Sequence, residues 1–234
     1  SLMGTVVGVF NPQITIAYAE DNTENLVKII KSCNRILIFI MSIPIAFLTA
    51  YGRDFYAMWQ PTKDADMLQR LSLLAVGVLY VSMSIQVLYH VFIITKKVKW
   101  NSLVILGSGV LSSCLSLLLL KTTDLGVMVF PLSSMLTGLL RNLIFTPIYA
   151  ARCLKIRWNR FYGDILLGWI SIGSIVILGN LSRMVFPVDS WIKLILTGVV
   201  MGPLALALNF LIILRKEERE MVIGMLKSRL KGAK

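Results

Sequence analysis

Seven long apolar blocks limit what this chain of 234 residues can fold into. A helix needs roughly 17 to 25 mostly apolar residues to cross about 30 Å of hydrocarbon, and each block has a length of that order. Helices are favoured because an unpaired backbone group in lipid costs several kcal/mol, and no block alternates as a barrel strand would. We therefore expect an all-α, polytopic membrane protein with seven transmembrane helices. The blocks are 1–19, 36–52, 71–95, 102–120, 125–151, 165–182 and 194–214.

Composition supports this class and argues against others. Hydrophobic residues make up 56% of the chain, charged residues 15%, and the mean hydropathy is +0.77. A soluble domain has about 25% charged residues, so an ordinary cytosolic enzyme, a disordered tail and a nucleic-acid module are all disfavoured.

The positive charges lie in alternate connections between blocks. Most Lys and Arg residues fall in 20–35, 96–101, 152–164 and 215–234, which accounts for much of the net charge of +12. The positive-inside rule then predicts that these loops and the C-terminus are cytoplasmic. Anionic lipid headgroups explain the charge without nucleic acid.

Two short elements are expected to lie at the membrane surface. Asp21 and Glu24 resemble a capping box, and the apolar residues that follow predict a surface helix leading into block 36–52. The tail 215–234 reads as a basic amphipathic cytoplasmic helix or a solvated helical tail. Block 1–19 has no features of a signal peptide, so the chain looks like the middle of a longer protein.

Polar residues inside the blocks form faces that suit either helix packing or a water-filled cavity. Asn11 and Thr15 share a face of the first block with Gly4, Gly8 and Tyr18. The third block places Ser82, Gln86 and His90 at a spacing of four. A weaker face in the last block includes Asn209. Proline residues predict kinks or breaks at Pro12, Pro44, Pro131, Pro147 and Pro203.

Arg141 is the most informative single residue. It lies 11 residues before Arg152, which puts it about 16 Å from the predicted cytoplasmic end of its helix. Such an Arg costs about 2.5 to 3.5 kcal/mol to insert, and no acid of this chain is expected at a matching depth. Arg141 is therefore paired with an acid elsewhere, hydrated, or available to an anionic ligand.

Catalytic and metal-binding motifs are absent from the sequence. There is one His, and the three Cys residues show no metal-ligand spacing. We expect no catalytic residues, no metal, no cofactor and no enzyme activity, and we see no mid-membrane carboxylate for ion coupling.

The order of several segments resembles a known family of transporters. These segments are Asn11-Pro12, the stretch from Tyr18 to Asp21, Asn34-Arg35, Ile43-Pro44, the aromatic outer loop 51–59 and the lysine-rich turn 95–99. They are similar to the C-terminal half of polysaccharide flippases, of the O-antigen and teichuronic-acid type, in the multidrug/oligosaccharidyl-lipid/polysaccharide exporter superfamily.

The resemblance implies a two-lobe transporter that works by alternating access. Residues 1–155 would belong to the second lobe, 156–214 would be two additional helices, and 215–234 the cytoplasmic tail. A first lobe, missing here, would precede them. The substrate would be a polyprenyl-diphosphate-linked glycan, moved for cell-surface polysaccharide biosynthesis. From polarity and depth alone, Arg141 and Arg35 are candidates for its anionic headgroup, and Asn11, Thr15, Gln86 and His90 for its sugars.

Two alternatives remain open. A cation-coupled multidrug antiporter of the same superfamily would need an intramembrane acid. A seven-helix receptor or photoreceptor fits the number of spans, but block 194–214 lacks an internal Lys for a retinal Schiff base.

Overall fold

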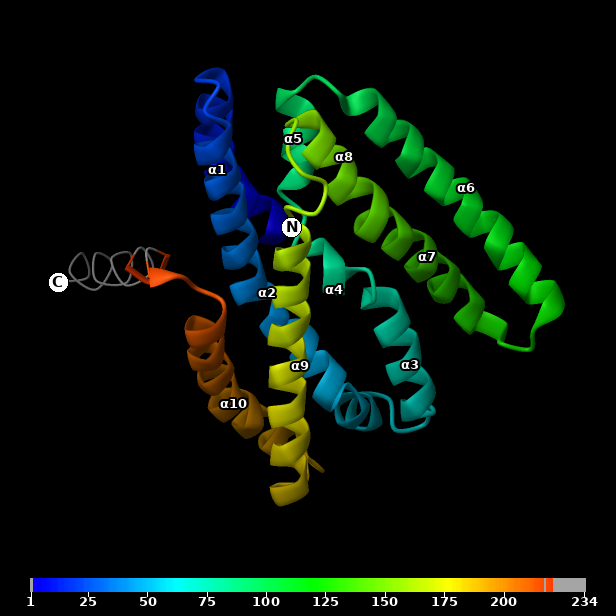
Figure 1. Ribbon diagram of the computed structural model, residues 1–234. Helices are drawn as coiled ribbons and strands as arrows, with labels where there is room; N and C mark the ends of the chain where they lie inside the picture. The colour runs from blue at the N-terminus through cyan, green and yellow to red at the C-terminus, as the bar shows by residue number, and fades with distance from the viewer. Residues whose placement is uncertain (1, 217, 221–234) are drawn as a thin grey trace.

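A computed structural model describes residues 2–216 and 218–220, which contain helices and no strands (Figure 1). The prediction of an all-α fold is confirmed for this part of the chain. The elements are α1 Leu2–Ala19, α2 Thr23–Trp59, α3 Ala65–Val76, α4 Leu79–Ser82, α5 Leu88–Ile94, α6 Val98–Thr122, η1 Gly126–Met128, α7 Val129–Leu140, η2 Arg141–Phe145, α8 Thr146–Cys153, α9 Tyr162–Val185 and α10 Trp191–Ile212.

Seven helical stretches of the described residues are long and apolar enough to cross a membrane. Each overlaps one of the seven predicted blocks, so the number of spans is also confirmed. The chain is therefore a multi-pass membrane protein. Many large apolar side chains on the outer surfaces of α6, α9 and α10 are exposed, as expected where lipid is the solvent.

Helix α2 is the centre of the bundle, since α1, α3, α9 and α10 all pack against it. Helices α6 and α7 form a hairpin at one flank (Figure 1). The α1–α2, α5–α6 and α8–α9 connections lie toward one end of the bundle, and the α2–α3 and α9–α10 connections lie toward the other (Figure 1). We call the first the basic end, because Lys96, Lys97, Arg157 and Arg160 lie in its connections.

The predicted surface helix before the second span is wrong as a separate element. Helix α2 runs without interruption through 37 residues, from Thr23 to Trp59. Its N-cap is Asn22, whose side chain accepts a hydrogen bond of 3.0 Å from the backbone N–H of Asn25, whereas Asp21 has φ +53° and does not cap. Leu26 and Ile30 are buried in the core, so this segment packs inside the protein.

Block 71–95 is not one helix. It consists of the end of α3, then α4 and α5, with residues 83–87 in a series of tight turns between α4 and α5. Here backbone bonds join residues three apart, such as Ile85 N–H to Ser82 C=O at 3.1 Å and Leu88 N–H to Ile85 C=O at 2.9 Å. The prediction that Ser82, Gln86 and His90 stack on one helical face is therefore wrong, because a tighter turn changes the angle per residue.

Block 125–151 contains a π-helical turn, η2, where Thr146 N–H bonds to Arg141 C=O. Pro147 follows at once, so the break predicted there is confirmed. Breaks predicted at Pro44 and Pro131 are wrong. Pro44 lies inside continuous α2, and Pro131 lies in the first turn of α7, where an amide hydrogen has no helical partner in any case.

The division into 1–155, 156–214 and 215–234 stays a prediction. The amphipathic helix expected in the tail falls mostly on 221–234, outside the described residues.

Candidate functional site

Helix α1 buries one apolar face and exposes most of the residues of its predicted polar face. The buried side chains are Met3, Val7, Phe10, Ile14 and Ala17. Gly4, Gly8 and Thr15, from the predicted polar face, are exposed, and Asn11 is half-buried. Leu2, Val9 and Ile16 of α1 are exposed as well, so the outward face of this helix is mixed, with polar and apolar side chains.

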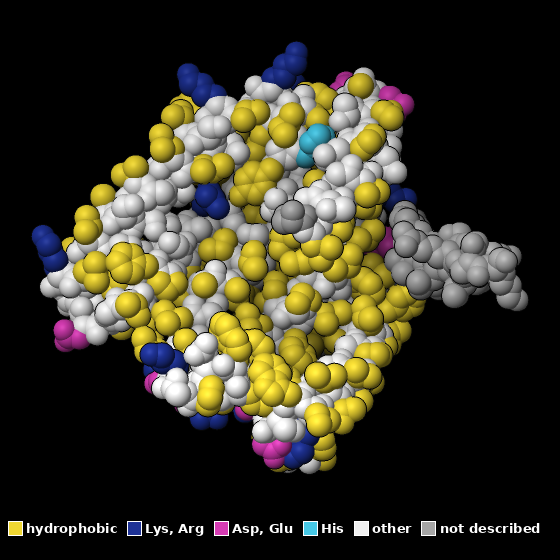
Figure 2. Space-filling model, turned by 180° about the vertical axis from the view of Figure 1, so that it is seen from behind, with side chains coloured by type: hydrophobic (Ala, Val, Ile, Leu, Met, Phe, Trp, Pro, Cys, Tyr) yellow, Lys and Arg dark blue, Asp and Glu magenta, His cyan; other side chains and the backbone are white. Residues whose placement is uncertain are grey.

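Three of the predicted polar residues come together where α1 meets α5. The Thr15 hydroxyl donates to the Asn11 carbonyl oxygen at 2.8 Å and lies 3.4 Å from His90 Nε2. The side-chain oxygen of Asn11 is buried and has no hydrogen-bond partner among the described residues. Gln86 is half-buried in the turns between α4 and α5. Figure 2 shows the histidine in cyan near a hollow that contains a cationic side chain.

A second polar cluster surrounds Asn142, which is 1% exposed. The Asn142 amide donates to Ser82 Oγ at 2.8 Å. Its oxygen accepts from the Tyr89 hydroxyl at 3.1 Å and from Arg141 Nε at 3.2 Å. Arg141 Nη1 also donates to Ser108 Oγ at 3.3 Å. We call these five residues the Asn142 cluster, which joins α4, α5, α6 and η2.

The cluster leaves Arg141 without a counter-charge. Its side-chain acceptors in the described part of the chain are a neutral amide and a hydroxyl, and no described acid pairs with it. A guanidinium has five N–H donors, so several are left for a further acceptor. Because Tyr89 and His90 are consecutive in α5, the α1–α5 contact and the Asn142 cluster are neighbours.

Arg35 belongs to a different place. It is 7% exposed and forms an ion pair with Glu218, with Arg35 Nη1 3.1 Å from Glu218 Oε1. Ser32 donates to the same oxygen at 2.8 Å. These partners lie at the basic end, so the structure does not bring Arg35 together with Arg141.

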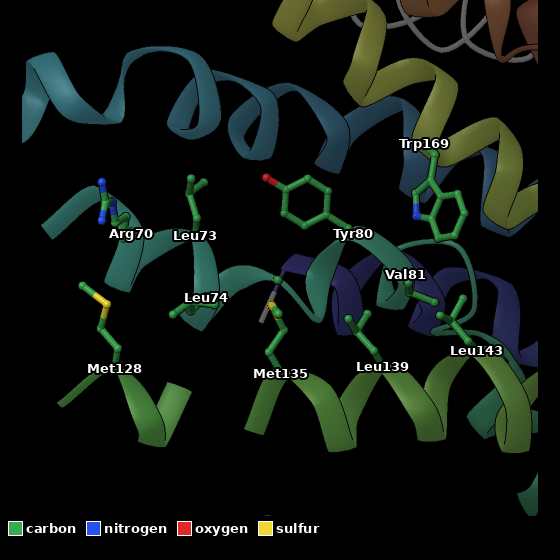
Figure 3. A pocket seen from close by; sticks show the side chains of 11 residues that line it. Arg70, Leu73, Leu74, Tyr80, Val81, Met128, Met135, Leu139, Leu143 and Trp169 are labelled. Carbon is green, nitrogen blue, oxygen red and sulfur yellow. The ribbon is translucent and has the colours of Figure 1, made fainter. Parts of the chain in front are cut away.

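An apolar pocket of about 700 Å³ lies on the other side of η2. Figure 3 shows Leu73, Leu74 and Tyr80 above it, Met135, Leu139 and Leu143 from the α7 side, and Trp169 from α9. Arg70 is its one charged lining residue. Leu143 of the pocket directly follows Asn142 of the cluster, and Val81 of the pocket directly precedes Ser82 of the cluster. The apolar pocket and the polar cluster therefore share a wall.

Sequence reasoning found Arg141 but missed Asn142, Tyr89 and Ser108. Asn142 carried one available signal, an amide next to the only Arg within an apolar block. Tyr89 and Ser108 gave none, because tyrosine and serine are common in spans. In the last block, Asn209 is fully buried and donates to Ser42 Oγ at 2.7 Å, so that face serves helix packing.

Comparison with known proteins finds one relevant relative. The chain is 26% identical over 230 residues to the "Uncharacterized membrane protein EpsK" of Bacillus subtilis (strain 168). The match covers 95% of this chain and 44% of that protein, so the chain spans less than half of its relative's length. No family model matches the chain, and no solved structure matches it. The relative's name agrees with a membrane protein and records no activity.

Proposed function

We propose that this chain is part of a flippase that moves a polyprenyl-diphosphate-linked oligosaccharide across the bacterial cytoplasmic membrane by alternating access. The observation that carries the proposal is Arg141, a cation within an apolar span that has neutral partners and no described acid. Its neighbour Asn142 accepts a hydrogen bond from Tyr89, and the next residue, His90, contacts Thr15 of α1. Retaining such a cation costs about 2.5 to 3.5 kcal/mol, which an anionic ligand would offset.

The chemistry of the headgroup fits this cation. A diphosphate offers several anionic oxygens, and a guanidinium binds phosphate oxygens in a planar, two-point geometry. Asn142 fixes the guanidinium through the hydrogen bond to Nε, so the arginine is held ready for its ligand. Thr15, His90 and Asn11 supply hydroxyl, imidazole and amide groups for sugar hydroxyls, with Gln86 in the adjoining turn.

The lipid part of the substrate needs an apolar path beside the headgroup. The pocket in Figure 3 supplies leucine, methionine and tryptophan surfaces on the other side of the wall formed by η2 and α4. We infer that the first isoprene units of the carrier contact this pocket while the glycan stays on the polar side.

Irregular helices at the site suit a transporter. Residues 83–87 and η2 both depart from regular α-helix; η2 contributes Arg141 and Asn142 to the cluster, and 83–87 connect Ser82 to the helix that carries Tyr89. Broken spans commonly form the substrate sites of secondary transporters, since backbone groups freed there are tolerated next to a cavity. The two lobes of a complete protein would rock around this region.

The test replaces Arg141 in the full-length protein with Ala or Lys. Export of cell-surface polysaccharide should fall about tenfold or more with Ala, because a charge-assisted hydrogen bond contributes about 1.5 to 3 kcal/mol. Lys should rescue only partly, since it cannot make the two-point contact. Arg152→Ala, at the exposed end of the same span, is the matched control. Normal export by Arg141→Ala at equal membrane abundance would remove Arg141 from the mechanism.

A multidrug antiporter is the alternative with an observation in its favour. Asp164, at the start of α9, is 3% exposed and accepts a hydrogen bond of 3.0 Å from the Asn34 amide. A buried acid is what ion coupling needs, although this one lies near the basic end of its helix. Asp164→Asn should leave glycan export intact if the flippase proposal holds, and should abolish drug efflux if the protein is an antiporter.

A further inference from the structure

A second pocket, of about 510 Å³, opens at the basic end, away from the Asn142 cluster. It lies between the first turns of α2, the connection before α9 and the residues that follow α10. Its lining contains six cations and two acids, which are Lys28, Lys31, Arg35, Arg160, Arg215, Lys216, Glu24 and Glu218. This excess of positive charge is gathered in a concave site, which distinguishes it from basic residues scattered along a loop.

The carboxylate of Glu218 shows what kind of group the pocket accepts. One of its oxygens accepts hydrogen bonds from Ser32 Oγ at 2.8 Å and from Arg35 Nη1 at 3.1 Å. The other oxygen accepts a hydrogen bond of 2.8 Å from the backbone N–H of Arg215. A hydroxyl, a guanidinium and a backbone amide converging on one anionic group are the donors that also bind phosphate. The Glu218 carboxylate thus already fills one anion-binding position of the pocket.

Donor capacity remains after Glu218 is bound. Lys31, Arg160 and Lys216 make no ion pair with any acid that the structure describes. Arg35 also lines the pocket, and its buried Nε has no described acceptor. The ammonium and guanidinium groups of Lys31, Arg160 and Lys216 can donate charge-assisted hydrogen bonds to a further anionic group in the pocket.

The surroundings of the pocket indicate where the anion comes from. Leu211 and Ile212, one turn before Arg215, are exposed on the apolar side of α10, and Trp158 is exposed two residues before Arg160. Exposed aliphatic residues next to Trp and cations mark the level of lipid headgroups. We propose that this pocket binds the phosphate of an anionic phospholipid headgroup through Lys31, Arg160, Lys216 and Arg35, beside Glu218. The proposal does not depend on the transport proposal.

Native mass spectrometry measures how much phosphatidylglycerol the purified full-length protein retains. Thermal unfolding in nanodiscs measures how much that lipid stabilises the protein. Nanodiscs of phosphatidylcholine are compared with and without phosphatidylglycerol, and a third arm adds inorganic pyrophosphate to phosphatidylcholine alone. The wild-type protein should retain phosphatidylglycerol and melt at a higher temperature in its presence. Protection by pyrophosphate without protection by phosphatidylglycerol would overturn the assignment to lipid.

Variants distinguish the pocket from general surface charge. Lys31→Gln with Arg160→Gln should weaken phosphatidylglycerol binding about tenfold or more, because each lost hydrogen bond from a charged donor to the phosphate contributes about 1.5 to 3 kcal/mol. Lys99→Ala with Arg152→Ala removes one exposed Lys and one exposed Arg at the same end, outside the pocket, and should change binding less than about twofold. Equal losses in the two pairs would overturn the proposal. Glu218→Gln should strengthen binding per folded molecule, because it removes a neighbouring negative charge and frees Arg35. Weaker binding by the folded fraction of that variant would contradict the proposal.

Discussion

The hydroxyl of Tyr162 donates a hydrogen bond of 2.7 Å to the carbonyl oxygen of Leu143. Leu143 lies four residues before Pro147, which has no amide hydrogen to give in a regular helix. Tyr162, from α9, therefore supplies the donor that the proline lacks. The π-helical turn that carries Arg141 and Asn142 is thus held from outside its own helix.

This relationship predicts coupling between Tyr162 and Pro147. Tyr162→Phe should destabilise the protein by about 1 kcal/mol, because the Leu143 carbonyl loses its partner. In a Pro147→Ala background the same change should cost less, since the alanine amide can replace the donor. A double-mutant cycle on thermal unfolding in detergent checks this, and equal costs in both backgrounds would contradict it.

A matched pair of glycines in α9 tests the packing of α9 on α2. A Cβ added at Gly179 would lie 2.8 Å from Ala50 Cβ and 3.3 Å from Tyr51 Cε2, whereas one at Gly173 meets nothing within 4 Å. Gly179→Ala should therefore destabilise the protein by about 1 to 3 kcal/mol through overpacking. Gly173→Ala in the same helix should be neutral or stabilising. Melting temperatures of both variants provide the measurement, and a similar loss in both would reject this account.

Placing an acid beside Arg141 tests whether its unpaired charge matters. Asn142→Asp is nearly isosteric and keeps an acceptor for Tyr89 and for Arg141 Nε, although it loses the amide that donates to Ser82 Oγ. It also neutralises the guanidinium at contact distance. Polysaccharide export should fall about as far as in Arg141→Ala, although thermal stability stays within about 1 kcal/mol of the wild type. Full export by Asn142→Asp would mean that the charge of Arg141 is not used.

The pair between Arg35 and Glu218 should be strongly coupled, because both side chains are less than a tenth exposed. Removing either partner leaves a buried charge without compensation, which costs about 3 to 5 kcal/mol. Arg35→Gln and Glu218→Gln should each be destabilising, and the double variant should cost less than the sum. The exposed pair between Arg53 and Asp66 is the control, and its cycle should give below about 1 kcal/mol. Additive losses at Arg35 and Glu218 would show that the pair is not energetically linked.

The sequence predicted the fold class and the number of spans, since hydropathy reports which stretches lipid can solvate. It did not predict the breaks at 83–87 and 141–145, because apolar composition does not specify which carbonyl each amide bonds. Only Pro147 gave a local signal for the second break. The ion-pair partner of Arg35 could not be predicted either, because Glu218 is 183 residues away along the chain. Long-range contacts of this kind depend on how the helices pack.

The structure brings some of the predicted site residues together and separates others. Asn11, Thr15 and His90 meet as members of one region, and Arg141 lies in the neighbouring cluster. Arg35 does not, because α2 continues as a single helix and carries it into the core beneath the end of α10. Their functional roles in transport stay predictions.

Helix α6 spans 25 residues, yet only Asn101 and Ser116 are buried, and its main neighbour is α7. At nearly every aliphatic position on α6, the side chain only has to be apolar enough to face the bilayer. Exchanges among Leu, Ile and Val along its length should leave folding almost untouched. Divergence between relatives should therefore concentrate in α6, and a reporter or affinity handle engineered on its outer surface should disturb the protein least.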